Sequence, residues 1–288
     1  MRTTTIPSCM MSLLLLTGGA LVGCGDDALP PDAAPIDALP ATGTFSLSWS
    51  ISDGTNPLSC EDVGALSVPV TLIPQGGLSG TAEAFACEGG MGNSRNLAPG
   101  TYDLTIDIRA SGSRSLLAEK ARVFGVKIEA DTDTPVAAQT FIIEPVGSLS
   151  FQVDSGATAG NCAAVDAGGG GIVDLEFGLK DKNNACVAAE FDVAAGSGAA
   201  TTYTSNCTTP AYLPCIGNDQ VITVDPLASG PWTLEVTGRK EGSIACYSSV
   251  SSTSVAGAKL ATELGTRSLI LEYSAQCDPD YIAPDGGM

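Results

Sequence analysis

The sequence predicts an all-β protein in which two tandem antiparallel β-sandwich domains follow a signal peptide and a disordered, acidic, proline-rich tether. Apolar and polar residues alternate along many short stretches, and this period of two is typical of strands with one buried face. A short apolar run stands at the N-terminus, and a segment rich in Pro and Asp follows it. The length of 288 residues suits about two domains.

Composition excludes several function classes. The chain has 13 Lys and Arg against 32 Asp and Glu, which gives a net charge of −19. Binding of nucleic acid requires Lys and Arg to meet the phosphates, so this balance excludes it. The chain has no His, which removes Ser-His-Asp and Cys-His catalysis and every imidazole metal ligand.

Residues 1–23 have the features of a signal peptide. Met10 to Gly23 is an apolar run of 14 residues, and a membrane-spanning helix needs about 20. The run ends in Leu21-Val22-Gly23-Cys24, which resembles the lipobox of bacterial lipoproteins. That resemblance implies cleavage before Cys24, a diacylglycerol on its thiol, and an acyl chain such as palmitate on the new amine. An ordinary secretory signal or an anchor helix with a chance cysteine is the alternative.

The same resemblance implies a location. In that family an Asp directly after the lipidated cysteine can cause retention in the inner membrane, and here the position is Gly25. We therefore expect a lipid-anchored protein of the outer membrane, exposed on the cell surface, with the periplasmic face as the alternative. The anchor is firm because each buried CH₂ of the acyl chains contributes about 0.8 kcal/mol.

Residues 24–42 are expected to form the lipidated cysteine and a disordered linker. Residues 25–42 hold four Pro and four Asp in 18 positions, which argues against helix, sheet or core. At about 3.1 Å per residue, an extended Pro-rich chain of this length reaches roughly 55 Å. Its Asp residues repel an anionic membrane surface, so we interpret it as a spacer. Recognition of Asp26 and Asp27 by sorting machinery is the alternative.

Domain 1 is predicted over residues 43–145. Its apolar residues alternate as expected for antiparallel strands that pack one face on a second sheet. Pro69 lies within one of these runs and lacks an N–H, so it predicts an edge strand or a bulge. The inward-facing residues are expected to be Phe45, Leu47, Trp49, Ile51, Leu66, Val68, Val70, Leu72, Tyr102, Leu104, Ile106 and Ile108.

Domain 2 is predicted over residues 146–280, with a flexible tail over 281–288. The same alternation identifies its inward-facing residues as Leu149, Phe151, Val153, Val173, Leu175, Phe177, Leu179, Trp232, Leu234, Val236, Leu269, Leu271 and Tyr273.

An internal repeat relates the two domains. Three pairs of segments match, namely 43–49 with 147–153, 97–104 with 227–234, and 142–144 with 270–272. The offset grows from 104 to about 130, so the second copy carries an insertion, which we place at about 181–215. The alternative is that two β domains look alike because all strands alternate.

The repeated turn supports a family resemblance. Leu97-Ala98-Pro99-Gly100-Thr101-Tyr102 resembles the Leu-x-Pro-Gly-x-Tyr signature of prealbumin-like sandwiches, which include carboxypeptidase regulatory-like and collagen-adhesin B-type domains. Pro-Gly makes a tight turn, and the aromatic residue then enters a core strand. Some adhesin relatives carry a Lys–Asn isopeptide bond from the first strand. Residues 44–52 and 147–153 contain no Lys, so that bond is not expected here.

Of the ten cysteines, Cys9 leaves with the signal peptide and Cys24 takes lipid, so eight remain, an even number in an oxidising compartment. Domain 1 holds two of them, and closing their loop stabilises it by roughly 3–4 kcal/mol. In domain 2 six cysteines allow 15 pairings, and the repeat offsets favour one set. A zinc site is disfavoured because Cys-x-x-Cys pairs are absent. The predicted disulfides are Cys60–Cys87, Cys162–Cys215, Cys186–Cys207 and Cys246–Cys277.

Four segments contain residue types that could carry chemistry. Asp154-Ser155-Gly156 resembles the motif of retroviral-type aspartic proteases, but that mechanism needs two such aspartates and the chain has no second motif. We interpret it as a turn. Residues 168–171, all Gly, precede a strand and are read as a flexible loop rather than a phosphate cradle. The acidic loops 131–133 and 181–184 offer oxygen ligands for Ca²⁺ without EF-hand spacing, and solvated turns are favoured.

These observations favour a non-enzymatic envelope lipoprotein with no cofactor and no metal. It would bind the membrane through its lipid and present loops to a protein or glycan partner, with 181–215 as the first place to look. The alternative is a structural or assembly subunit of an envelope complex facing the periplasm. The third hypothesis is a hydrolase that uses carboxylates, including that of Asp154.

Overall fold

The computed structural model describes residues 40–110, 116–118, 120–194, 199–205 and 212–278. The predicted signal peptide, Cys24, nearly all of the tether and the predicted tail lie outside these residues. Within the described part, strands follow one another with three short 3-10 turns between them, η1 (Glu61–Val63), η2 (Cys87–Gly89) and η3 (Val165–Ala167). In this part no helix is long and apolar enough to cross a membrane.

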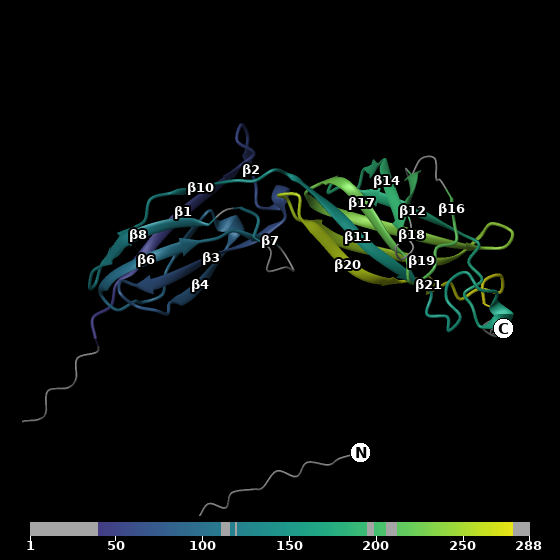
Figure 1. Cartoon of the computed structure of the whole chain (residues 1–288), viewed down its shortest axis with the longest axis horizontal. Coiled ribbons are helices and arrows are strands. Elements are labelled where there is room, and N and C mark those ends of the chain that lie inside the picture. Colours follow the sequence, from purple (N-terminus) through teal and green to yellow (C-terminus); the bar gives the residue numbers. More distant parts are fainter. Residues whose placement is uncertain (1–39, 111–115, 119, 195–198, 206–211, 279–288) are drawn as a thin grey trace, which may run out of the picture. The chain divides into compact units, whose positions relative to one another are not determined.

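Strands β1 to β10 form the first sandwich (Figure 1). One sheet is centred on β1 (Thr44–Ser52), which pairs with β2 (Pro57–Leu58), β5 (Met91–Asn93), β9 (Asp133–Pro135) and β10 (Gln139–Ile142). The other sheet has the order β4-β3-β6-β8, and β7 also pairs with β3. Its strands are β3 (Ala65–Pro74), β4 (Thr81–Ala86), β6 (Gly100–Ile106), β7 (Arg109–Ala110) and β8 (Ala121–Ile128).

Strands β11 to β21 form the second sandwich (Figure 1). The order of one sheet is β15-β14-β17-β11-β20, formed by β11 (Val146–Asp154), β14 (Ala189–Ala194), β15 (Thr201–Ser205), β17 (Val221–Ala228) and β20 (Ala261–Ser268). The other has the order β13-β12-β18-β19-β21, and β16 also pairs with β12. It consists of β12 (Asp174–Lys180), β13 (Cys186–Val187), β16 (Leu213–Pro214), β18 (Gly230–Lys240), β19 (Ile244–Val255) and β21 (Ile270–Leu271).

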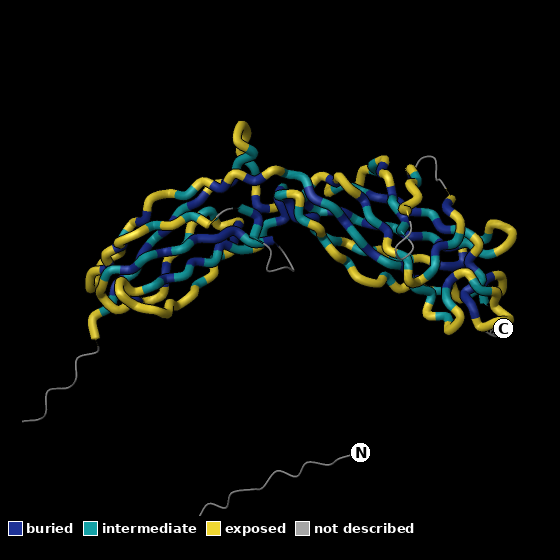
Figure 2. Tube along the Cα trace, in the orientation of Figure 1, coloured by how far each residue is buried: buried dark blue, intermediate teal, exposed yellow. Residues whose placement is uncertain are grey.

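The alternation of apolar residues produces two separate hydrophobic cores, seen as buried stretches along the strands in Figure 2. In β1 the buried positions recur every second residue, and Phe45 and Leu47 are almost fully enclosed. In the second core Phe177 stacks on Phe191 and meets Phe151 edge to face. The all-β sandwich prediction is therefore confirmed.

Three predicted core residues are exposed instead. Leu66 is 59% exposed because a β-bulge between Ala65 and Ser67 turns it outward. Val173 lies one residue before β12 begins, and Tyr273 lies two residues after β21 ends. The alternation of a sequence does not show where a bulge shifts the pleat or where a strand stops.

Pro69 predicted an edge strand or a bulge, and of these two alternatives the edge strand was wrong, because β3 lies between β4 and β6. On the β6 side, Val70 pairs with Ile106 and Ser67 pairs with Arg109 of β7. Pro69 lies at the break between these two partners, where its carbonyl accepts the N–H of Asp107 at 3.0 Å. The missing N–H of proline is tolerated there because the ladder is already interrupted.

The repeat in the sequence has a counterpart in detailed contacts. Tyr102 Oη donates to the carbonyl of Ala98, and Trp232 Nε1 donates to that of Ala228, both at 2.8 Å. At Gly43 a Cβ would lie 2.0 Å from a backbone carbonyl oxygen, and at Gly147 the same distance is found. The first strand of each sandwich also pairs in parallel with a late strand, β1 with β10 and β11 with β20. These shared details favour duplication over chance alternation.

The two sandwiches meet at the 3-10 turn η1. Asp62 accepts a hydrogen bond from Lys182 Nζ at 2.9 Å, and its carbonyl accepts one from Ser229 Oγ at 2.6 Å. The N–H of Gly257 donates to the carbonyl of Val63 at 3.0 Å. Ser59 Oγ also donates to Asp62 at 2.7 Å, so the carboxylate joins both sandwiches.

These partners lower the pKa of Asp62 to about 2, mainly through the Ser59 hydroxyl and then through Lys182. A depressed pKa of an acid stabilises the fold above the pKa of the unfolded chain, roughly 4 for Asp. That contribution is lost as the pH falls from there toward the folded value.

We therefore expect Asp62→Asn to remove a stabilising contribution that is present at pH 7 and absent near pH 2. The free energy of unfolding of the wild type should fall more steeply between pH 4 and pH 2 than that of the variant, measured by urea denaturation. Asp166→Asn is the matched control, because Asp166 occupies the corresponding first turn of η3 and is exposed. Equal slopes for Asp62→Asn and the wild type would contradict the prediction.

Candidate binding surface

Three of the predicted disulfides are present. They join Cys60 to Cys87, Cys162 to Cys215, and Cys246 to Cys277. Cys186 is also disulfide-bonded, and its predicted partner, Cys207, lies outside the described residues. Cys24, the predicted site of lipid attachment, lies outside them as well.

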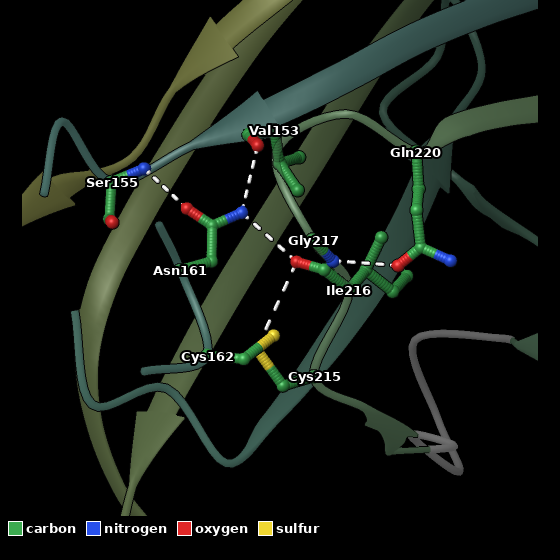
Figure 3. The surroundings of a disulfide bond; sticks show 8 residues. All are labelled: Val153, Ser155, Asn161, Cys162, Cys215, Ile216, Gly217 and Gln220. Carbon is green, nitrogen blue, oxygen red and sulfur yellow. Dashed lines mark hydrogen bonds between the residues drawn. A yellow bond between two sulfur atoms is a disulfide. The ribbon is translucent and has the colours of Figure 1, made fainter. Parts of the chain in front are cut away.

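The insertion of the second sandwich ends at a covalent and hydrogen-bonded junction (Figure 3). Next to Cys162, the amide of Asn161 is 1% exposed and makes three hydrogen bonds to backbone. Its Oδ1 accepts from the N–H of Ser155 at 2.8 Å, and its Nδ2 donates to Val153 and Ile216 carbonyls at 2.9 and 3.0 Å. These bonds tie the loop after β11 to the end of the insertion. Asn161 was not predicted from the sequence, where its position beside a paired cysteine was the one indication of its role.

The Asp154 motif forms a turn, as predicted from the sequence. Its Oδ1 accepts the N–H of Gly156 at 2.9 Å, and Gly156 has a φ of +74° that favours glycine. This is the geometry of an Asx turn at the end of β11. The glycine loop that follows is pinned by Tyr247, whose hydroxyl donates to the carbonyl of Gly170 at 2.8 Å.

The predicted insertion contains β13 to β16. Its hairpin β14–β15 adds two strands to the sheet of β11, because Asp192 of β14 pairs with Thr223 of β17. Its final strand β16 pairs with the edge of β12. The insertion therefore extends one sheet and reaches the other, and its side chains can lie on the outer face of β12 and β18.

A charged aromatic cluster lies on this outer face. Arg239 of β18 donates through Nε and Nη2 to the two carboxylate oxygens of Asp174, each at 2.5 Å. The guanidinium carbon lies 3.1 Å from the ring centroid of Tyr212, a residue of the insertion that is 45% exposed. The planar guanidinium is thus held by a bidentate ion pair and covered by a ring.

Two further ionised side chains extend the surface along β12. Lys180 Nζ lies 2.6 Å from Glu235 Oε1. Between the two ion pairs stands Glu176, whose carboxyl pKa is raised mainly by partial burial, while the charge of Arg239 opposes that rise. We call Asp174, Glu176, Tyr212, Glu235 and Arg239 the β12–β18 surface. It offers a ring, carboxylate acceptors and a fixed guanidinium, which are groups that recognise polar partners.

Sequence reasoning did not single out this surface. The alternation shows only that Asp174 and Arg239 take outward positions in two strands. It does not show that the two residues are opposite each other. That pairing depends on the register of β12 and β18. The role of Tyr212 depends on the path of the insertion.

Each acidic loop uses a carboxylate in an internal hydrogen bond, one within its own turn and one to a neighbouring strand. Asp181 Oδ1 accepts the N–H groups of Asn183 and Ala185, each at 2.9 Å. Asp133 Oδ1 accepts the hydroxyl of Thr44 at 2.9 Å. Among the residues that the structure describes, no three His, Cys, Asp or Glu side chains are grouped so that they could hold a metal ion.

Comparisons with known proteins give no family. No family model and no curated protein matches the chain. A leucine-rich repeat protein from Bacteroides thetaiotaomicron is 16% identical with a TM-score of 0.24, and the match covers 80% of this chain but 26% of that protein. The major pilin of Streptococcus pyogenes is 10% identical with a TM-score of 0.26, over 80% of this chain and 99% of the pilin.

The minor pilin of Streptococcus agalactiae is also 10% identical, with a TM-score of 0.24 over 81% of this chain and 98% of that one. Similarities of this size carry no argument about function. The functional conclusion therefore depends on the chain's own residues.

We expect Asn161→Ala to lower the free energy of unfolding by about 2–3 kcal/mol, because it leaves the buried partners of the amide without hydrogen bonds. Urea denaturation followed by circular dichroism measures this. Asn93→Ala, at an exposed position of β5, is the control and should stay within about 0.5 kcal/mol of the wild type. If Asn161→Ala loses no more unfolding free energy than Asn93→Ala, the junction is held by the disulfide alone.

Proposed function

We propose that this chain is a lipid-anchored lipoprotein of the outer membrane that acts at the cell surface as a non-enzymatic binding or adhesion module. The observation that carries the proposal is the order of its parts. The lipobox at Cys24 is followed by 18 residues rich in Pro and Asp, and the first strand begins at Thr44. A lipid, a spacer and a folded pair of sandwiches in this order fit a module that is held away from a membrane.

The proposed contact region for a partner is the β12–β18 surface together with the insertion. Tyr212 is partly exposed and is held in place by Arg239, so it can pack on a partner with little loss of side-chain entropy. The carboxylate of Glu176 can accept hydrogen bonds from hydroxyl or amide groups. The partner is accordingly a protein or a glycan.

A second function has a specific observation in its favour. Val250 of β19 and Ile270 of β21 are 68% and 70% exposed. Ile270 pairs with Ser248, and Val250 lies two residues along the same face of β19. Exposed apolar neighbours suit a protein interface, which would make the chain a structural or assembly subunit that faces the periplasm.

The anchor and the exposed location are tested together. We expect Cys24→Ser to move the protein from the membrane fraction to the soluble fraction and to abolish incorporation of labelled palmitate, because the thiol that accepts the lipid is gone. In intact cells that carry the wild type, added protease should remove the protein while a periplasmic lipoprotein control survives. If the protein resists the protease until the outer membrane is broken, surface exposure is contradicted and the assembly subunit is favoured.

The contact region is tested by replacing Tyr212 with the photocrosslinker p-benzoylphenylalanine in cells. We expect a discrete adduct on irradiation, since this side chain lies at the proposed contact. The same replacement at Phe124, which is 70% exposed on β8 of the first sandwich, is the control and should give none. Adducts at Ile270 with none at Tyr212 would instead support the assembly interface.

A further inference from the structure

The first sandwich contains a cavity of about 300 Å³ beside the Cys60–Cys87 disulfide. Its walls include the apolar side chains of Trp49, Ile51 and Leu58. The cavity is far from the β12–β18 surface in sequence, and none of its lining residues belongs to the insertion. Its volume is at the lower end of the range for small-molecule sites.

Two carboxylates line the same cavity, and the disulfide fixes both. Glu61 follows Cys60 directly and opens the turn η1, and Glu88 follows Cys87 directly within η2. Because one covalent bond joins the residues before them, the two acidic turns are held on the same side of the sandwich. Both glutamates are exposed, so their charged groups face solvent at the cavity while the apolar residues lie deeper.

The apolar wall is also rigid. Trp49 Nε1 donates to the carbonyl of Cys87 at 2.9 Å. The indole stacks on Phe85 with ring centroids 6.1 Å apart and an interplanar angle of 23°. Trp49 is therefore fixed by a hydrogen bond and by a ring, and the cavity that it lines needs little ordering when a ligand enters.

The electrostatics of the cavity favour a cation. None of its lining residues is basic, and no described ion pair involves Glu61 or Glu88. Lys182 attracts Glu61 electrostatically, but its ammonium group is bonded to Asp62. An anion would be repelled by both carboxylates, and a neutral apolar ligand would leave them unused.

We propose that this cavity binds a small organic ammonium ion that carries an apolar body. The apolar part packs against Trp49, Ile51 and Leu58, and the ammonium group lies between the carboxylates of Glu61 and Glu88. The indole adds to the attraction, because an aromatic ring attracts a nearby cation. The net charge of −19 enriches cations near the protein and so assists their entry.

Calorimetric titration of the full chain in a nonionic detergent tests the ligand class with three probes of matched shape. These are 2-phenylethylammonium, neutral 2-phenylethanol and anionic 3-phenylpropionate. We expect the ammonium ion to bind about tenfold more tightly than the alcohol, and the carboxylate to show no binding, since two partly solvated ion pairs each contribute a few-fold. Raising NaCl from about 20 mM to about 500 mM should weaken the binding of the ammonium ion and leave the binding of the alcohol unchanged.

Variants test the site. The double variant Glu61→Gln/Glu88→Gln should weaken binding of 2-phenylethylammonium about tenfold, close to the alcohol. Glu190→Gln, an exposed glutamate on β14, is the matched control and should leave the affinity unchanged. Because both cavity glutamates are exposed, the double variant should keep the thermal unfolding midpoint of the wild type, which separates loss of binding from loss of fold.

A third measurement locates the ligand. The chain has two tryptophans, so incorporation of 5-fluorotryptophan gives two ¹⁹F resonances, from Trp49 and Trp232. Titration with the ammonium ion should shift the Trp49 resonance and leave that of Trp232 in place. Equal binding of the ammonium ion and the alcohol, unchanged affinity in the double variant, or a shift confined to Trp232 would each overturn the proposal.

Discussion

The parallel pairing of the first strand of each sandwich with a late strand is the constraint on which the rest of the structure depends. Trp49 of β1 pairs with Gln139 of β10, and Ser148 of β11 pairs with Ala261 of β20. Each pairing closes a loop of roughly a hundred residues, which is costly in entropy and slow to form. Gly43 and Gly147 stand at the start of these first strands, and each lies against a backbone carbonyl of a later segment, Glu129 and Ala256, where a Cβ cannot fit.

The disulfides reduce that entropic cost. Cys60–Cys87 and Cys162–Cys215 each close a shorter loop inside one of these long loops, with sequence separations of 27 and 53. This matters because aromatic residues make up 5% of the chain, so the cores contain few large side chains. The same bonds also set the functional geometry. Cys60–Cys87 holds Glu61 and Glu88 at one cavity, and Cys162–Cys215 ends the insertion that carries Tyr212.

The sequence predicted the features that follow a strict period and missed those that depend on pairing. Alternation was enough to place Phe45 and Leu47 in a core, and the repeat offsets selected Cys162–Cys215 among 15 pairings. Leu66 was misplaced because a bulge is a property of two strands and not of one. Arg239 and Asp174 were missed for the same reason, since their contact depends on the register of β12 and β18.

Several carboxylates that the structure describes in turns already have hydrogen-bond partners in the protein, and this determines where a charge can serve binding. Asp154 and Asp181 accept N–H groups of their own turns, and Asp62 is occupied by Ser59 and Lys182. A carboxylate that is engaged in this way is poorly available to a ligand, because a new partner must first replace existing hydrogen bonds. Glu61 and Glu88 take part in none of the described ion pairs, yet the Cys60–Cys87 disulfide fixes the position of both. In a strongly acidic protein, a preorganised pair of carboxylates that make no described ion pair, placed beside apolar walls, is therefore a more selective feature than acidity itself.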